Sequence, residues 1–162
     1  LAYHSPLSNN EQGYAAEVLI TLMAGGMSSR LFSEIREKRN LAYAVKGASE
    51  INKDFSYSLI YVGTMKENVE KVKQLILEEF EKVAKDLTEK EFEEVKEQLI
   101  GNYHIGMEDS QSQMVNLLVE EMNGNSKEFY EFEKNIRAVK IEDVKKLAKL
   151  KDYSFLALVP ED

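Results

Sequence analysis

GGMSSRLFSEIREKRNLAY, which runs from Gly25 to Tyr43, joins two helices and a strand without a long loop. Glycine allows backbone angles that other residues avoid, so the Gly25-Gly26 pair predicts the end of a helix over residues 14–23. Leu31, Phe32 and Ile35 then recur at helical spacing. This spacing predicts a second, short helix with one buried side.

A tight corner is expected where the second helix ends. Asn40 is a common substitute for glycine in the left-handed residue that closes a helix. Residues 41–50 then have the composition of a strand. Arg36 and Tyr43 are seven residues apart and therefore lie on either side of one helix-to-strand corner. We place the functional site at this corner.

The same stretch resembles the C-terminal half of the M16 zinc metallopeptidases, the pitrilysin-like and mitochondrial-processing-peptidase-like enzymes. That family typically has a Gly-rich turn, then SRLF, then R-E-K-x-x-L-x-Y. Asn40 stands where the family usually has glycine, and asparagine tolerates the same backbone conformation. Further similarity covers nearly the whole chain, at residues 63–64, 94–101, 108–114 and 136–144.

The rest of the sequence predicts an α+β fold. Capping boxes are expected at Thr88-Glu91, where Glu91 would reach back to the cap, and at Ser110-Gln113. The apolar run 154–159 predicts a strand buried on both faces. These elements favour an open, mostly antiparallel sheet with helices on one face, as the resemblance also implies. The expected strands are 1–6, 41–50, 55–62 and 154–159, and the expected helices are 14–23, 65–83, 88 to about 101–106, 110–123, 128–135 and 141–150.

Length and charge limit the kind of protein. The 162 residues predict a single domain over 1–162, which we interpret as a fragment of a longer chain. The formal charge of −8, from 21 basic and 29 acidic residues, argues against nucleic acid or an anionic membrane as a partner. The sequence as given has neither a long apolar run nor a signal-peptide pattern, which favours the cytoplasm. A homo-oligomer remains open.

A metal site is not expected in these residues. The chain has no cysteine and two histidines, His4 and His104, and neither lies in an H-x-x-E-H motif. Glu108 is four residues after His104, but two ligands make a poor site. The resemblance implies that zinc belongs to the full enzyme and is bound by a separate N-terminal half, in the same chain or in a partner subunit.

Arg36 and Tyr43 are the expected catalytic and substrate-binding residues, because the family has an arginine and a tyrosine at this spacing facing the zinc. An Arg fork can bind a peptide carbonyl or carboxylate, and a phenol can donate to an oxyanion. The alternatives are an ion pair of Arg36 with a neighbouring acid and a half-buried packing role for Tyr43. Gly25 and Gly26 are expected to bind substrate, with a plain helix break as the alternative.

The sequence therefore predicts the C-terminal, substrate-binding domain of a zinc-dependent endopeptidase that cleaves peptides or presequences and is inactive alone. The alternative is a catalytically silent binding module, like the family's core subunits in respiratory complexes. A stand-alone hydrolase has no nucleophile-base pair to support it. Tyr57 and Tyr61 alternate along the expected strand 55–62 and are interpreted as residues of core or cross-strand packing.

Overall fold

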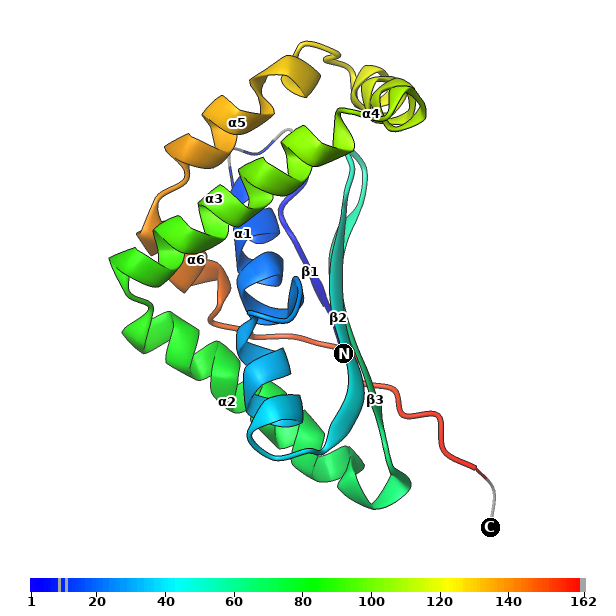
Figure 1. Ribbon diagram of the computed structural model, residues 1–162, viewed down its shortest axis with the longest axis vertical. Helices are drawn as coiled ribbons and strands as arrows, with labels where there is room; N and C mark the ends of the chain where they lie inside the picture. Colours follow the sequence, from blue (N-terminus) through cyan, green and yellow to red (C-terminus); the bar gives the residue numbers. More distant parts are fainter. Residues whose placement is uncertain (9, 11, 161–162) are drawn as a thin grey trace.

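The computed structural model describes residues 1–8, 10 and 12–160 and shows a three-stranded antiparallel sheet backed by helices (Figure 1). Strands β1 (Ala2–His4), β2 (Ala42–Ile51) and β3 (Ser56–Thr64) are ordered β1-β3-β2. β2 and β3 form a long hairpin, and the short β1 pairs with the other edge of β3. The predicted α+β class and antiparallel sheet are confirmed.

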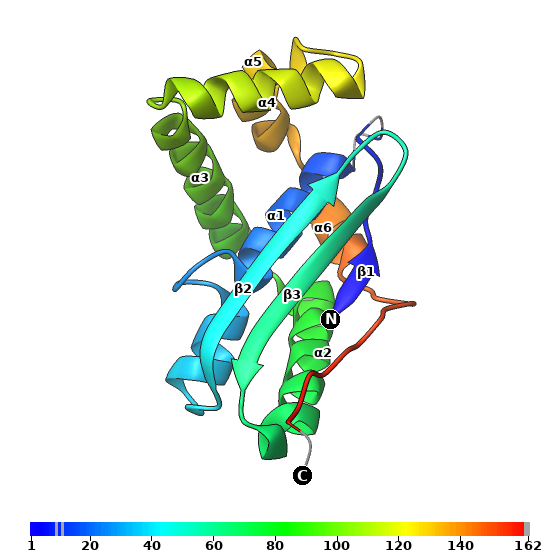
Figure 2. The ribbon, with the colours of Figure 1, turned by 90° about the vertical axis from the view of Figure 1, so that its right-hand side faces the viewer.

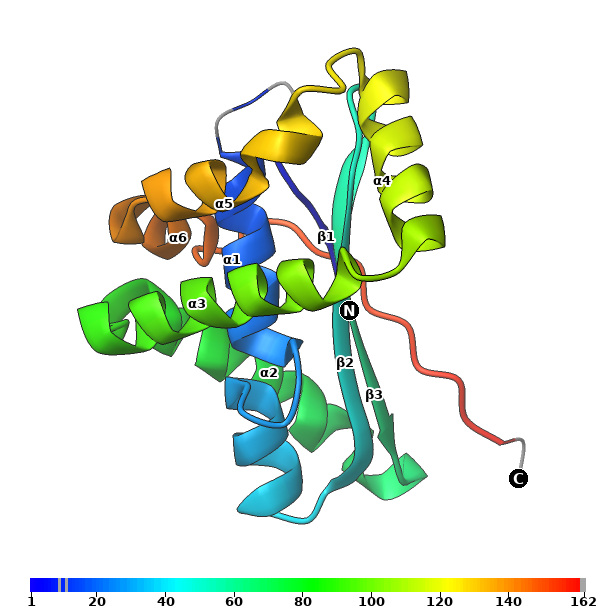
Figure 3. The same ribbon diagram turned by 45° about the horizontal axis from the view of Figure 1, so that its top comes forward.

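The helices follow the predicted order with small shifts of their ends. α4 lies near the end of the β2–β3 hairpin and contacts α5, and none of its described residues is buried (Figures 2 and 3). No helix in the described ranges is both long and apolar enough to cross a membrane. The helices are α1 (Gly13–Ala24), the π-helix η1 (Phe32–Glu37), the 3₁₀ turn η2 (Lys66–Asn68), α2 (Val69–Asp86), α3 (Glu89–Gly106), α4 (Ser110–Asn123), α5 (Glu128–Ala138) and α6 (Ile141–Leu147).

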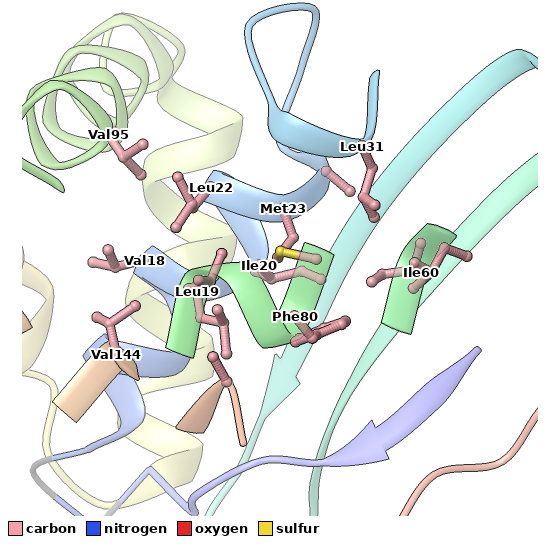
Figure 4. Packing of buried hydrophobic residues seen from close by; sticks show 14 of the residues in the cluster. Val18, Leu19, Ile20, Leu22, Met23, Leu31, Ile60, Phe80, Val95 and Val144 are labelled. Atoms are coloured by element: carbon pink, nitrogen blue, oxygen red, sulfur yellow. The ribbon is translucent and has the colours of Figure 1, made fainter. Parts of the chain in front are cut away.

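α1 is the central helix of the core. It is apolar on nearly all sides, as expected for a helix that other elements surround. It packs on β2 and also contacts α3, α5 and α6. Figure 4 shows its side chains, with Leu19 and Met23 fully buried, facing residues of the sheet and of the other helices. Gly47 of β2 lets the two elements approach closely, because a Cβ there would lie 2.8 Å from the Ala24 Cβ.

The opposite face of the sheet is not covered by a described element (Figure 2). Along β3, buried and exposed residues alternate, as expected for a strand with one solvated face. Tyr57, Leu59 and Tyr61 are 40%, 44% and 52% exposed. A core position for Tyr57 and Tyr61 is therefore wrong, because the register directs both to the outer face, where they face Glu50 and Lys46 of β2 across the strand pair.

One of the two predicted capping boxes is only partly correct, and the other is wrong. Thr88 accepts a hydrogen bond from the Glu91 amide, but the Glu91 carboxylate binds Arg30 and does not reach back to the cap. The N-cap of α4 is Asp109, whose carboxylate accepts from the Ser112 amide at 2.7 Å. A carboxylate before the helix therefore supplies the cap predicted for Ser110.

The predicted strand over 154–159 is also wrong. Ser154 forms an isolated bridge with Ala2, and the chain then leaves the sheet. Leu156 and Leu158 are 88% and 98% exposed, and a groove of about 480 Å³ lies between this segment and β3. An apolar run forms a strand only where a neighbour can pair with it.

Glu17 on α1 is a half-buried carboxylate in an acidic environment. Burial, reinforced by the negative charges of Glu50 on β2 and Glu120 on α4, raises the pKa of Glu17 to about 7. The folded chain therefore holds a proton on this side chain that the unfolded chain releases at lower pH.

We expect the free energy of unfolding to fall as the pH rises from about 5 to about 8, because Glu17 must then lose its proton in the folded state. Glu17→Gln should remove about 1–2 kcal/mol of this fall. Urea unfolding at a series of pH values measures the effect. Glu142→Gln, on the exposed side of α6, is the matched control and should leave the pH profile unchanged. Identical profiles for both variants would contradict the assignment.

Candidate functional site

The corner between residues 25 and 47 concentrates unusual backbone. Residues 32–37 form a π-helix, in which the Lys38 amide donates to the Ser33 carbonyl at 3.0 Å. Asn40 has φ of 52° and is left-handed, as predicted, and the Leu41 amide donates back to the Ile35 carbonyl at 2.9 Å. π-helical turns are often found at functional sites. The chain thus turns from helix to strand within a few residues.

Arg36 projects from the π-helix into solvent. Its guanidinium lies over the Phe32 ring, 4.9 Å from the centroid. The neighbouring Glu34 is bound by Lys38 and Arg39, and these interactions, led by the hydrogen bond from Lys38, hold the pKa of Glu34 below its usual value. Among the described residues, none forms an ion pair with Arg36. The alternative in which Arg36 pairs with a neighbouring acid is not what the structure shows.

Tyr43 lies at a β-bulge. The pairing of β2 with β3 shifts between Ala42 and Ala44, so Tyr43 is the extra residue. Its side chain is 69% exposed, so the half-buried packing role is wrong. Its ring lies against Gly63 of β3, and its hydroxyl interacts with that of Tyr61. Bulges commonly redirect a side chain beside an active site.

The Gly25-Gly26 turn follows α1 and is held by several hydrogen bonds. A Cβ on Gly25 would lie 2.6 Å from the Thr21 Cα, and Gly26 has φ of 138°, so both positions require glycine. The Gly25 amide donates to the Thr21 carbonyl, and the Gly25 carbonyl accepts from the Gln98 side chain at 3.0 Å. Local geometry thus accounts for the helix break, and the Gly25 amide is not free to bind a ligand.

One hollow of about 490 Å³ brings the four predicted site residues together. Gly25, Gly26, Arg36 and Tyr43 all line it, together with residues 44–47 of β2. Sequence reasoning missed Met27 and Phe32 as lining residues. The signal for Phe32 was its position four residues before Arg36, which places a ring under a cation on a helix.

The described residues do not fit a zinc site. His104 bonds Glu133 at 3.0 Å on the exposed surface, and His4 lies on β1. Within residues 1–8, 10 and 12–160, no group of three or more His, Cys, Asp or Glu residues could hold a metal ion. The chemistry of the hollow is that of hydrogen-bond donors, a guanidinium and a phenol.

Residues 1–99 match the family described as the Peptidase M16 inactive domain. The chain belongs to the M16 peptidase family, as this inactive domain. The predicted resemblance is therefore confirmed. A protein of Mycobacterium tuberculosis named as an uncharacterized zinc protease is 34% identical to this M16 domain over 151 residues, which are 92% of this chain and 34% of the relative. The domain thus spans about a third of the length of that relative.

Solved structures share the fold of this M16 domain. A protease from Helicobacter pylori matches with a TM-score of 0.81 and 21% identity, over 91% of this chain and 36% of that one. A chain of complex III₂ from Candida albicans matches with a TM-score of 0.79 and 20% identity, over 91% of this chain and 38% of that one. At these identities the likeness concerns the fold alone.

An ion-pair network fixes the corner of the M16 domain to its helices. The Arg30 guanidinium binds the Glu91 carboxylate of α3 with two hydrogen bonds, of 2.6 and 2.5 Å. It also lies 3.7 Å from Glu79 of α2, which is 5% exposed. The bidentate contact ties Arg30 firmly to α3.

We expect Arg30→Met to lower the free energy of unfolding by about 2 kcal/mol, because it leaves the buried Glu79 with Lys82 as its remaining cation. The matched control is Lys90→Met, which removes an exposed pair with Glu94 at 3.8 Å and should cost less than about 0.5 kcal/mol. Urea unfolding measures both. Equal losses would show that Arg30 does not hold the corner.

Proposed function

We propose that this domain supplies Arg36 and Tyr43 to the peptide-cleavage site of an M16 zinc endopeptidase. The observation that carries the proposal is their shared position. Both side chains are exposed, both line one hollow, and neither is neutralised by an acid among the described residues. Zinc and the base glutamate belong to an N-terminal half, in the same chain or in a partner subunit. We place the full protein in the cytoplasm.

The two side chains act as donors to the peptide. The Arg36 fork binds a backbone carbonyl or a carboxylate of the substrate and orients it. The Tyr43 hydroxyl donates to the oxygen of the scissile carbonyl as negative charge develops there. Donors that are already aimed at this charge cost no reorganisation during the reaction, and each contributes about 3 kcal/mol. Gly25 and Gly26 shape the wall of the hollow.

The substrate is an unfolded peptide or a presequence, bound in extended form. β2 is the last strand in the order β1-β3-β2, so its outer edge has no described strand beside it. The edge residues 44–47 line the same hollow as Arg36 and Tyr43. A peptide that pairs with this edge by strand addition passes both donors.

A structural role without catalysis is the second candidate. The match to a chain of complex III₂ favours it, because the same fold occurs there in a respiratory assembly. The feature that distinguishes the two candidates lies in the N-terminal half and not in these 162 residues. An N-terminal half with an intact H-x-x-E-H motif supports the peptidase, and a half without that motif supports the structural module.

In the full-length, zinc-loaded protein, we expect Arg36→Ala and Tyr43→Phe each to lower kcat/KM for a quenched-fluorescent peptide by about tenfold or more. Tyr57→Phe is the matched control for Tyr43→Phe. It removes a hydroxyl from the same sheet face near the other end of β3, and its effect should be less than about twofold. Near-normal turnover in both site variants would overturn the proposal.

The 162-residue domain alone is expected to bind no zinc and to hydrolyse no peptide, because its described residues do not form a metal site. Dialysis against zinc followed by elemental analysis measures the bound zinc. The quenched-fluorescent peptide assay measures hydrolysis. Zinc bound at one equivalent, with hydrolysis, would place the whole reaction inside this domain and contradict the division between two halves.

A further inference from the structure

Three features of β2 and β3 together determine where the Tyr43 ring lies. The first is the bulge. The partners Ala42↔Thr64 and Ala44↔Gly63 leave Tyr43 without a partner of its own, and its side chain lies on the outer face of the sheet. A residue in a bulge is less constrained than one in a regular ladder. Something else must therefore fix the direction of this ring.

The second feature is the absence of a side chain at Gly63. A Cβ there would lie 2.4 Å from both Cε2 and Cζ of Tyr43, and 2.7 Å from its hydroxyl oxygen. Non-bonded carbon atoms are attracted at about 3.5–4.0 Å and repelled at such short distances. The φ of Gly63 lies outside the left-handed region, so the backbone does not require glycine here. Glycine is required by the ring that rests on it.

The third feature is Tyr61, two residues before Gly63 on the same face of β3 and 52% exposed. Its hydroxyl interacts with that of Tyr43, and this hydrogen-bonding interaction raises the pKa of Tyr43. The Tyr43 phenol therefore stays protonated and can donate. Tyr61 faces Lys46 across the β2–β3 pair.

We propose that Gly63 and Tyr61 are positioning residues for Tyr43. Gly63 provides the flat surface on which the ring lies, and Tyr61 fixes the position of the hydroxyl by interacting with it. This inference rests on the proposed function of Tyr43. It assigns a role in substrate binding to two residues that line no part of the hollow themselves.

A double-mutant cycle in the full-length, zinc-loaded protein tests Gly63. With a quenched-fluorescent peptide, Gly63→Ala should lower kcat/KM about tenfold, because the added methyl group displaces the Tyr43 ring. In a Tyr43→Ala background, the same Gly63→Ala change should have an effect of less than about twofold, since no ring remains to be displaced. Gly101→Ala, at a position with no atom within 4 Å of the added Cβ, is the matched control and should leave activity unchanged. An equal loss in both backgrounds would mean that Gly63→Ala only damages the strand, and would overturn the proposal.

Tyr61→Phe is the second variant, because it keeps the ring and the backbone and so preserves the fold. It should lower kcat/KM severalfold and lower the pKa of Tyr43, followed by NMR of tyrosine labelled at Cζ. An unchanged pKa of Tyr43 together with unchanged activity would overturn the role of Tyr61.

If Tyr43→Phe itself has full activity, the proposed function fails and this inference fails with it. If Tyr43→Phe is impaired while Gly63→Ala is fully active, only the inference about positioning fails.

Discussion

The close packing of α1 on β2 is the contact on which the candidate site depends. Gly47 has no side chain to separate the strand from Ala24 and Ile20, the last buried residues on that side of the helix. The C-terminal end of α1 is therefore held against the middle of β2. The chain then has only residues 25–41 in which to leave the helix and return to the start of the same strand. The Gly25-Gly26 turn, η1 and the first residues of β2 necessarily surround one hollow.

Unusual backbone is concentrated in this short return path. Gly26 and Asn40 have positive φ, residues 32–37 form a π-helix, and Tyr43 is the extra residue of a bulge. Each of these conformations is less favourable than regular helix or strand, and each persists only where surrounding contacts determine it. The bidentate contact of Arg30 with Glu91, the buried Leu31 and Ile35, and the hydrogen bond from Gln98 to Gly25 supply those contacts. Strain and support in one place are typical of a functional site.

Local signals predicted the parts of the site that depend on neighbours in sequence. Glycine pairs and asparagine have intrinsic backbone preferences, so the end of α1 and the left-handed Asn40 could be read directly. The bulge at Tyr43 and the glycine opposite it could not, because they depend on how two strands align across the sheet.

The strand predicted over residues 154–159 was wrong for a related reason. Periodicity shows that a segment is suited to burial, but it does not show whether a partner strand lies beside it. Likewise, the sequence Thr88-Glu91 predicts a capping box, yet Glu91 is bound by a guanidinium from a distant part of the chain. The strong attraction between a guanidinium and a carboxylate outweighs the weaker local bond.

The proposed function explains why the position of the hollow must be fixed so firmly. It offers a guanidinium and a phenol, and the described residues around it provide no metal site. Such donors lower a barrier only when a nucleophile from elsewhere meets the same carbonyl, and their benefit falls steeply if they are misplaced by about 1 Å. Under this proposal, a domain that contributes donors alone must hold them rigidly relative to its own surface. Mounting Arg36 and Tyr43 on a helix and a strand that pack on the core, and not on a loop, meets this requirement.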